Sequence, residues 1–189
     1  MTDGGFDDPT LAEWNLQIFD TSTIGVDADA TGDAGSWSLL LRKKLGENPN
    51  SLRVTQCIET VPGTQLDLSA RLRIPTQSAA GAAFLSFQWW EEPGCGGSIL
   101  GNYDAPVFTP PPDTWTSLGP FSPEVPAGAD SVLLYVGVVV TVDPGSPEVF
   151  EASWDDVSVV PEPGGAGAAA ALGALAHLLR RRRPRPARG

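Results

Sequence analysis

Alternation of apolar and polar residues is the feature that most restricts how this 189-residue chain folds. In Gln65–Ile74, apolar side chains occupy every second position, and polar or charged side chains occupy the positions between them. Successive side chains of a β-strand point to opposite faces, so this segment has one face for a core and one for water. Ala82–Glu92 is also predicted to be a strand, with Leu85, Phe87 and Trp89 on its more apolar face and Phe84, Ser86, Gln88 and Trp90 on the other.

The rest of the body is also built from short segments that suit strands. Gly, Pro, Asn and Asp separate the segments, a pattern typical of an antiparallel β-sandwich or barrel. The remaining predicted strands are Glu13–Phe19, Trp37–Arg42, Arg53–Thr60, Trp115–Leu118, Ser131–Thr141 and Val149–Val160. Ser131–Thr141 is almost wholly apolar and is predicted to be central, whereas Gly94–Pro112 is rich in Gly and Pro and is predicted to be a long surface loop. The sequence therefore predicts an all-β domain over residues 1–159.

Charge separates this body from the end of the chain. Up to residue 160 the sequence has 6 basic and 22 acidic residues, a net charge of −16, whereas the remainder has a net charge of +5. A body this acidic is not expected to bind nucleic acid, because affinity for phosphates depends on Lys and Arg. It suits divalent cations or neutral polymers instead.

The last 30 residues contain three zones in a fixed order. Pro161, Glu162 and Pro163 come first, an apolar run rich in Ala, Leu and Gly follows over residues 164–179, and six arginines close the chain. Prolines end regular structure, an apolar run enters a bilayer as a helix, and arginines stay on the cytoplasmic side. This order resembles the PEP-CTERM sorting signal of Gram-negative bacteria. The resemblance implies export, transient membrane anchoring, cleavage by an exosortase, and release to the cell surface or the extracellular polysaccharide matrix.

Two observations leave alternatives open for this tail. The apolar run has 16 residues, fewer than the roughly 20 that span a bilayer. A disordered basic tail that binds anionic polymers is the other interpretation. Met1 is followed directly by Thr-Asp-Gly-Gly-Phe, so the export prediction also implies a secretion signal that was removed or lies upstream of the given start.

Short motifs at both ends of the body resemble a known fold. The body opens with Gly4-Gly5-Phe6-Asp7-Asp8 and closes with Trp154-Asp155-Asp156-Val157; Thr114-Trp115 and a Pro-Ala-Gly turn at 126–128 lie between them. These motifs resemble the galactose-binding-like jelly roll, a superfamily that includes carbohydrate-binding modules. The resemblance spans Gly4–Val159 and implies an antiparallel jelly-roll β-sandwich in which Trp14, Trp115 and Trp154 pack in the core.

The same resemblance implies a structural calcium ion that joins the first and last strands. Asp7 stands at the position of the family's N-terminal acid, with Asp155 or Asp156 as the partner carboxylate and a backbone oxygen near Gly5. Calcium binds several carboxylate and carbonyl oxygens together. The alternative is that these are turn and strand-edge carboxylates in water.

Aromatic residues are the candidate sugar contacts, because flat rings stack on sugar rings beside a few polar groups. Trp89 and Trp90 are consecutive in a strand and face opposite ways, so Trp90 is the surface candidate. Tyr103, in the predicted loop, and Gln88 complete the predicted ligand set. The alternative is that Trp90 only covers the sheet.

Cys57 and Cys95 are a disulfide candidate if the chain is exported, and two unpaired thiols are the alternative. No enzyme is predicted: the only histidine is His177 in the tail, so the body has no Ser-His-Asp or Cys-His arrangement. Two functions remain: a carbohydrate-binding domain that attaches to exopolysaccharide, and a structural surface or matrix protein that binds no sugar.

Overall fold

The computed structural model describes residues 6, 10–18, 21–28, 30, 37–141 and 147–161. These residues form ten β-strands and no helix. The strands are β1 (Asn15–Gln17), β2 (Thr23–Ala28), β3 (Trp37–Lys44), β4 (Ser51–Glu59), β5 (Leu66–Arg73), β6 (Gly81–Glu92), β7 (Gly96–Asp104), β8 (Thr116–Phe121), β9 (Ser131–Val140) and β10 (Val149–Pro161).

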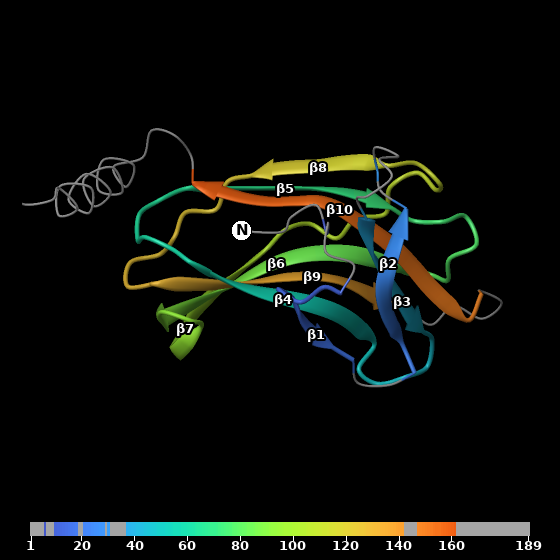
Figure 1. Cartoon of the computed structure of the whole chain (residues 1–189), viewed down its shortest axis with the longest axis horizontal. Helices are drawn as coiled ribbons and strands as arrows, with labels where there is room; N and C mark the ends of the chain where they lie inside the picture. The colour runs from blue at the N-terminus through green and yellow to red at the C-terminus, as the bar shows by residue number, and fades with distance from the viewer. Residues whose placement is uncertain are drawn as a thin grey trace, which may run out of the picture.

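The strands form two five-stranded antiparallel sheets that lie one above the other (Figure 1). The first sheet has the order β1-β4-β9-β6-β7, and the second has the order β2-β3-β10-β5-β8. Most neighbours within a sheet are not consecutive along the chain, because the chain passes back and forth between the layers, as it does in jelly-roll sandwiches. The prediction of an all-β antiparallel sandwich is confirmed.

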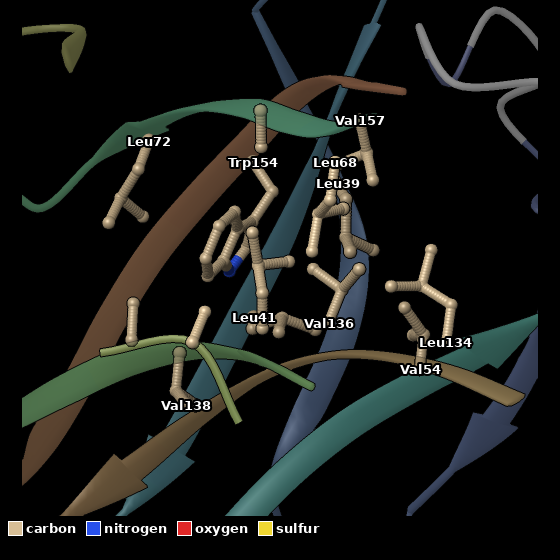
Figure 2. Packing of buried hydrophobic residues seen from close by; sticks show 14 of the residues in the cluster. Leu39, Leu41, Val54, Leu68, Leu72, Leu134, Val136, Val138, Trp154 and Val157 are labelled. Carbon is tan, nitrogen blue, oxygen red and sulfur yellow. The ribbon is translucent and has the colours of Figure 1, made fainter. Parts of the chain in front are cut away.

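The core fills the space between the inner faces of the two sheets. Trp154 of β10 is fully buried and extends from the second sheet toward Val136 and Val138 of β9 (Figure 2). Leu39 and Leu41 of β3 are equally buried. The central positions of β9 and β10 explain why both strands are so apolar: each is flanked by hydrogen-bonded neighbours and covered by the opposite sheet.

Two strands were not predicted from the sequence. β2 has Gly25 and Asp27 among its six residues, and β7 has three glycines within what was predicted to be a loop, Gly94–Pro112. That loop prediction is wrong for residues 96–104. Both strands lie at the edge of a sheet and pair with only one neighbouring strand. The strand propensity of their residues is therefore a poor guide to whether they form strands. The register shifts between β6 and β7 show that β7 pairs irregularly.

The last strand, β10, ends at the last residue that the structure describes. β10 runs to Pro161, which pairs with Leu66 of β5. The predicted sorting motif residues Glu162 and Pro163 and the apolar and arginine zones lie outside the described residues. Within the residues that the structure describes, no helix is long and apolar enough to cross a membrane.

A disulfide joins Cys57 of β4 to Cys95 in the turn between β6 and β7. Three hydrogen bonds hold the same turn: Gly94 N donates to Glu59 Oε1 (2.8 Å), Cys95 N donates to Ser131 Oγ (2.9 Å), and Ser131 Oγ donates to the carbonyl of Glu92 (2.6 Å). The β6–β7 hairpin is therefore fastened across β9 to β4.

We expect replacement of both cysteines by serine to lower the free energy of unfolding by about 3–4 kcal/mol, because the bond shortens a large loop of the unfolded chain. Chemical denaturation of the oxidised wild type, the reduced wild type and the double variant measures this. The reduced wild type should match the variant, and equal midpoints for all three would contradict the prediction.

Candidate functional site

The outer face of the first sheet carries the candidate site. In β6, Leu85, Phe87 and Trp89 are buried against the second sheet, so Gln88 and Trp90 point outward. Trp89 is 4% exposed and Trp90 is half-buried, as the alternation predicted.

Five side chains form a line of contacts across this face, and each comes from a different strand. Arg53 Nε donates to Gln17 Oε1 (2.7 Å), and the Arg53 guanidinium lies 4.7 Å from the centre of the Tyr135 ring. Tyr135 Oη donates to Gln88 Oε1 (3.0 Å), and Gln88 Nε2 donates to Asn102 Oδ1 at the long distance of 3.4 Å. Gln17, Arg53, Tyr135, Gln88 and Asn102 are called the band below; in this order they cross β1, β4, β9, β6 and β7.

The band fixes the orientation of Tyr135. A guanidinium over an aromatic face contributes roughly 0.5–1 kcal/mol where it is exposed and more where water is excluded. The phenol oxygen is held at the other end of the ring by Gln88. Arg53, Tyr135 and Gln88 are all half-buried, so the ring is set in place yet keeps contact with solvent.

Phe84 of β6 lies beside the band, over a glycine. A Cβ on Gly137 of β9 would stand 2.4 Å from Phe84 Cζ and 2.7 Å from Cε1, so the ring covers the bare backbone of Gly137. Gly137 is paired with Arg53 on one side and Phe84 on the other. The missing side chain lets the ring lie against the sheet beside Arg53 and Tyr135.

Trp90 lies near the other side of the band, beside the disulfide-bonded hairpin. It pairs with Ser131 of β9 and with Ile99 of β7. Its indole Nε1 is buried and has no hydrogen-bond partner among the described residues. What Trp90 offers a ligand is therefore part of its ring surface and not its N–H group.

Tyr103 does not share this face. It belongs to β7 and not to a loop, it pairs with Phe87, and its ring centre lies 6.4 Å from that of Phe87 against the core. Because residues opposite one another in a ladder point to the same side, Tyr103 faces inward and Trp90 faces outward. The prediction that Tyr103 lies in a loop and joins Trp90 in the ligand set is therefore wrong for this face, because Tyr103 is a strand residue whose register with Phe87 turns it toward the core.

Sequence reasoning missed Phe84, Tyr135 and Arg53 as site residues. The sequence places Tyr135 in an apolar central strand and Arg53 at the start of another strand, and neither position by itself indicates a surface site. The signal that finds them is parity: once Trp89 is assigned inward, Phe84 must face outward, and the antiparallel register then puts Tyr135 and Arg53 on the same side.

The residues predicted to bind calcium are only partly described. Gly5 and Asp7 lie outside the described residues, so the calcium site stays a prediction. Asp155 is buried, and its two oxygens accept from the backbone N–H groups of Ala30 (2.7 Å) and Asp156 (2.8 Å). Asp156 lies at a bulge with a φ of 47° and approaches Arg71. The described residues contain no cluster of three or more metal-binding side chains, so the two aspartates alone do not form the site.

Two of the three tryptophans predicted to pack in the core are buried, and the third is not. Trp14 is 5% exposed and packs on Phe6 with ring centres 5.1 Å apart, and Trp154 is fully buried. Trp115 is half-buried instead, and the Arg73 guanidinium lies 5.3 Å from its ring centre. Trp115 precedes β8, an edge strand of the second sheet with one neighbouring strand, whereas Trp154 lies in the central strand β10.

Two arginines of the second sheet form salt bridges with acidic residues of other strands in the same sheet. Arg42 pairs with Glu151 (2.7 Å) and Arg73 with Asp27 (2.6 Å). The hydrogen bond from Arg42 to Glu151, with the attraction between the charges, raises the pKa of the Arg42 guanidinium above its usual value. In a neighbouring loop, hydrogen bonds from the hydroxyl and backbone N–H of Thr76 hold the pKa of Asp113 below its usual value. These groups tie structural elements together and lie away from the band.

Two hollows among the described residues lie at strand ends. One of about 370 Å³ is lined by residues that include Ser78, Glu148 and Glu151, and one of about 430 Å³ by residues that include Glu47, Asn50 and Thr141. The band, by contrast, extends along a sheet surface. An extended surface suits a long, linear ligand, whereas such hollows suit small ones.

No family model matches this sequence, and no curated protein matches it. Solved structures do match its fold. The CBM22-2 xylan-binding domain of Xyn10C from Paenibacillus barcinonensis is 14% identical with a TM-score of 0.58, over 84% of this chain and 98% of that domain. TmCBM61, solved with β-1,4-galactotriose, is 10% identical with a TM-score of 0.51, over 86% of this chain and 97% of that module.

A third match belongs to a much longer protein. The enzymatically active domain of tailspike protein 4 from bacteriophage CBA120 is 17% identical with a TM-score of 0.59, over 86% of this chain, which spans 21% of that domain. At these identities the likeness concerns the fold. The chain has the jelly-roll β-sandwich of carbohydrate-binding modules, as its terminal motifs predicted.

We expect Gly137→Ala to displace the Phe84 ring and to destabilise the fold by about 1–3 kcal/mol, the usual cost of adding atoms to a packed site. Gly101→Ala is the matched control, because a Cβ there meets only Trp89 Cδ1 at 3.9 Å. In the background Phe84→Ala, the effect of Gly137→Ala should shrink. Thermal melts of the four variants measure this, and equal melting temperatures for the two glycine variants would contradict it.

Proposed function

We propose that this chain is a carbohydrate-binding domain that holds an extended polysaccharide against the outer face of its first sheet. The observation that carries the proposal is the band, in which five strands each contribute one side chain to a continuous line of contacts. The similarity in fold to carbohydrate-binding modules supports it.

The chemistry of the band suits sugars. The Tyr135 and Phe84 rings and the exposed part of Trp90 offer apolar faces to the C–H side of a sugar ring. Arg53 and Asn102 offer N–H donors to hydroxyls: Asn102 Oδ1 accepts from Gln88, which leaves its Nδ2 group to donate outward. Five strands at about 4.8 Å spacing extend the line over about 19 Å, enough for several sugar rings in a row.

We propose further that the domain has no catalytic role of its own. The body contains no histidine, and adjacent Glu91 and Glu92 point to opposite faces of β6. Binding affinity, without bond cleavage, is the property that a flat aromatic and polar surface supplies. The alternative function, a matrix or surface protein without a sugar ligand, leaves the outward groups of the band unused.

We also propose that the chain is exported and sorted by its C-terminal segment. The three ordered zones after Val160 support this, and a disulfide supports an oxidising compartment. In this proposal an exosortase cleaves near Pro161-Glu162-Pro163 and releases the domain to the cell surface or matrix, where polysaccharide is present.

Tyr135→Ala should weaken binding to the best ligand of a glycan array, with xylan and β-1,4-galactan included, at least about tenfold, or about 1.4 kcal/mol. Tyr135→Phe should lose less, because the ring stays. Trp90→Ala should also weaken binding. Trp115→Ala is the matched control, since it removes a half-buried aromatic side chain near the other sheet. Isothermal titration on cooperatively folded variants measures this.

A wild-type protein that binds no glycan on the array would contradict the binding proposal and favour the structural alternative. A large loss of stability in Trp90→Ala, about 3–5 kcal/mol, would assign Trp90 to packing and remove it from the ligand set.

Glu162→Ala should block processing and leave the protein in the membrane fraction of the native host, because the motif is the proposed cleavage signal. Fractionation and mass spectrometry of the mature protein measure this. Mature wild-type protein that still carries residues 164–189 would contradict the sorting proposal.

A further inference from the structure

Arg53 differs from every other arginine in the described part of the chain. Arg42, Arg71 and Arg73 each lie within 4 Å of a carboxylate, those of Glu151, Asp156 and Asp27. Arg53 has no carboxylate partner among the described residues; its neighbours are the neutral amide of Gln17 and the ring of Tyr135. In a body with 22 acidic and 6 basic residues, a half-buried arginine without an acidic partner is unexpected.

The contacts of Arg53 hold its guanidinium in place but do not occupy the N–H groups on its two terminal nitrogens. Only Nε donates within the described structure, to Gln17, so the four N–H groups on the two terminal nitrogens have no partner among the described residues. The guanidinium carbon Cζ also lies over the Tyr135 ring, 4.7 Å from its centre. The group is therefore held in one orientation with its two terminal nitrogens unused.

Two unused, coplanar nitrogens match one kind of ligand group in particular. The fork of a guanidinium binds a carboxylate through two parallel N–H···O bonds, and such charge-assisted pairs are roughly twice as strong as neutral hydrogen bonds. Sugar hydroxyls offer single oxygens and no charge. The usual protein partner of such a fork, an Asp or Glu, is absent here among the described residues, although it is present at Arg42, Arg71 and Arg73.

From Arg53, which is second in the band and has no carboxylate partner among the described residues, we infer that the preferred ligand is an acidic polysaccharide, one that carries uronic acid residues. A sugar carboxylate binds the terminal nitrogens of Arg53, while the neighbouring rings contact the apolar faces of the polymer. The inference rests on the proposed function and names the ligand class of that same surface.

Among the described residues, the acidic groups on this face of β4, β6 and β7 are Glu59, Glu92 and Asp104, and all three lie far from Arg53 along the sheet. Asp104 lies on β7, three strands from β4, or about 14 Å at 4.8 Å per strand. Glu59 lies six residues farther along β4 than Arg53, about 20 Å at about 3.4 Å per residue. Both distances exceed the screening length of about 8 Å at physiological salt, whereas a direct Arg53–carboxylate contact is much shorter.

The test compares uronic-acid oligosaccharides with forms of the same oligosaccharides in which the carboxylate is reduced to a hydroxymethyl group. Oligogalacturonides and glucuronic-acid-bearing xylo-oligosaccharides are the probes, and titration with the full chain is the readout. We expect the acidic form to bind at least about tenfold more tightly, and the difference to shrink as salt is raised.

Three variants assign the preference to the side chain. Arg53→Gln should bind both forms with equal affinity, so the ratio of the two affinities should fall to about one, whatever affinity for neutral sugars the variant loses with the Arg53 donors. Arg53→Lys should keep part of the preference, because it keeps the charge and loses the fork. Arg42→Gln is the matched control: it removes the same charge from an exposed pair on the second sheet and should keep the full preference.

The outcomes separate the two proposals. Equal binding of the acidic and reduced forms to the wild type, or a preference that survives in Arg53→Gln, overturns this inference. The carbohydrate-binding proposal still stands in that case if Tyr135→Ala weakens binding at least about tenfold. No binding of either form overturns this inference, and it overturns the proposed function as well only if no glycan of the array binds. Loss of the preference in Arg42→Gln would assign it to net charge and overturn the role of Arg53.

Discussion

Contact between the two inner faces is the constraint on which the rest of this structure depends. In β10, Phe150, Ala152 and Trp154 fill the core only in this register, because a shift of one residue would turn Glu151 toward the core. The same constraint decides what points outward. Arg53, Tyr135 and Gln88 stand in line because Val54, Leu134 and Phe87 are buried on the other side of the same three strands.

The central strands of this sandwich could be predicted because the patterns that indicate them stand in consecutive residues of the sequence. Alternation in β5 and β6 and the apolar run of β9 stand in consecutive residues, and the structure has strands at all these places. The edge strands β2 and β7 could not be predicted in the same way. Each has a single neighbour and a sequence rich in turn-forming residues, so their pairing depends on strands that are remote in sequence.

The candidate site was predictable only in part, and for a related reason. Gln88 and Trp90 follow from parity within one strand. Arg53 and Tyr135 join them only through the order of the strands, which places β4 and β9 next to β6 although they are about 30–50 residues away along the chain. Tyr103 shows the opposite error: its polarity and its loop-like surroundings favoured an exposed position, but its register with Phe87 turns it inward.

The contact between Phe84 and Gly137 links the residue types that these two positions can hold. The ring occupies the space that any other residue at 137 would fill with its own Cβ. The two positions therefore behave as one structural unit that can be gained or lost only together. Among proteins with this sandwich, a branched residue at the position of Gly137 in the central strand should occur together with a small residue at the position of Phe84 in the neighbouring strand. A search for ligand platforms that looks only for aromatic residues would overlook the glycine that lets the ring lie flat.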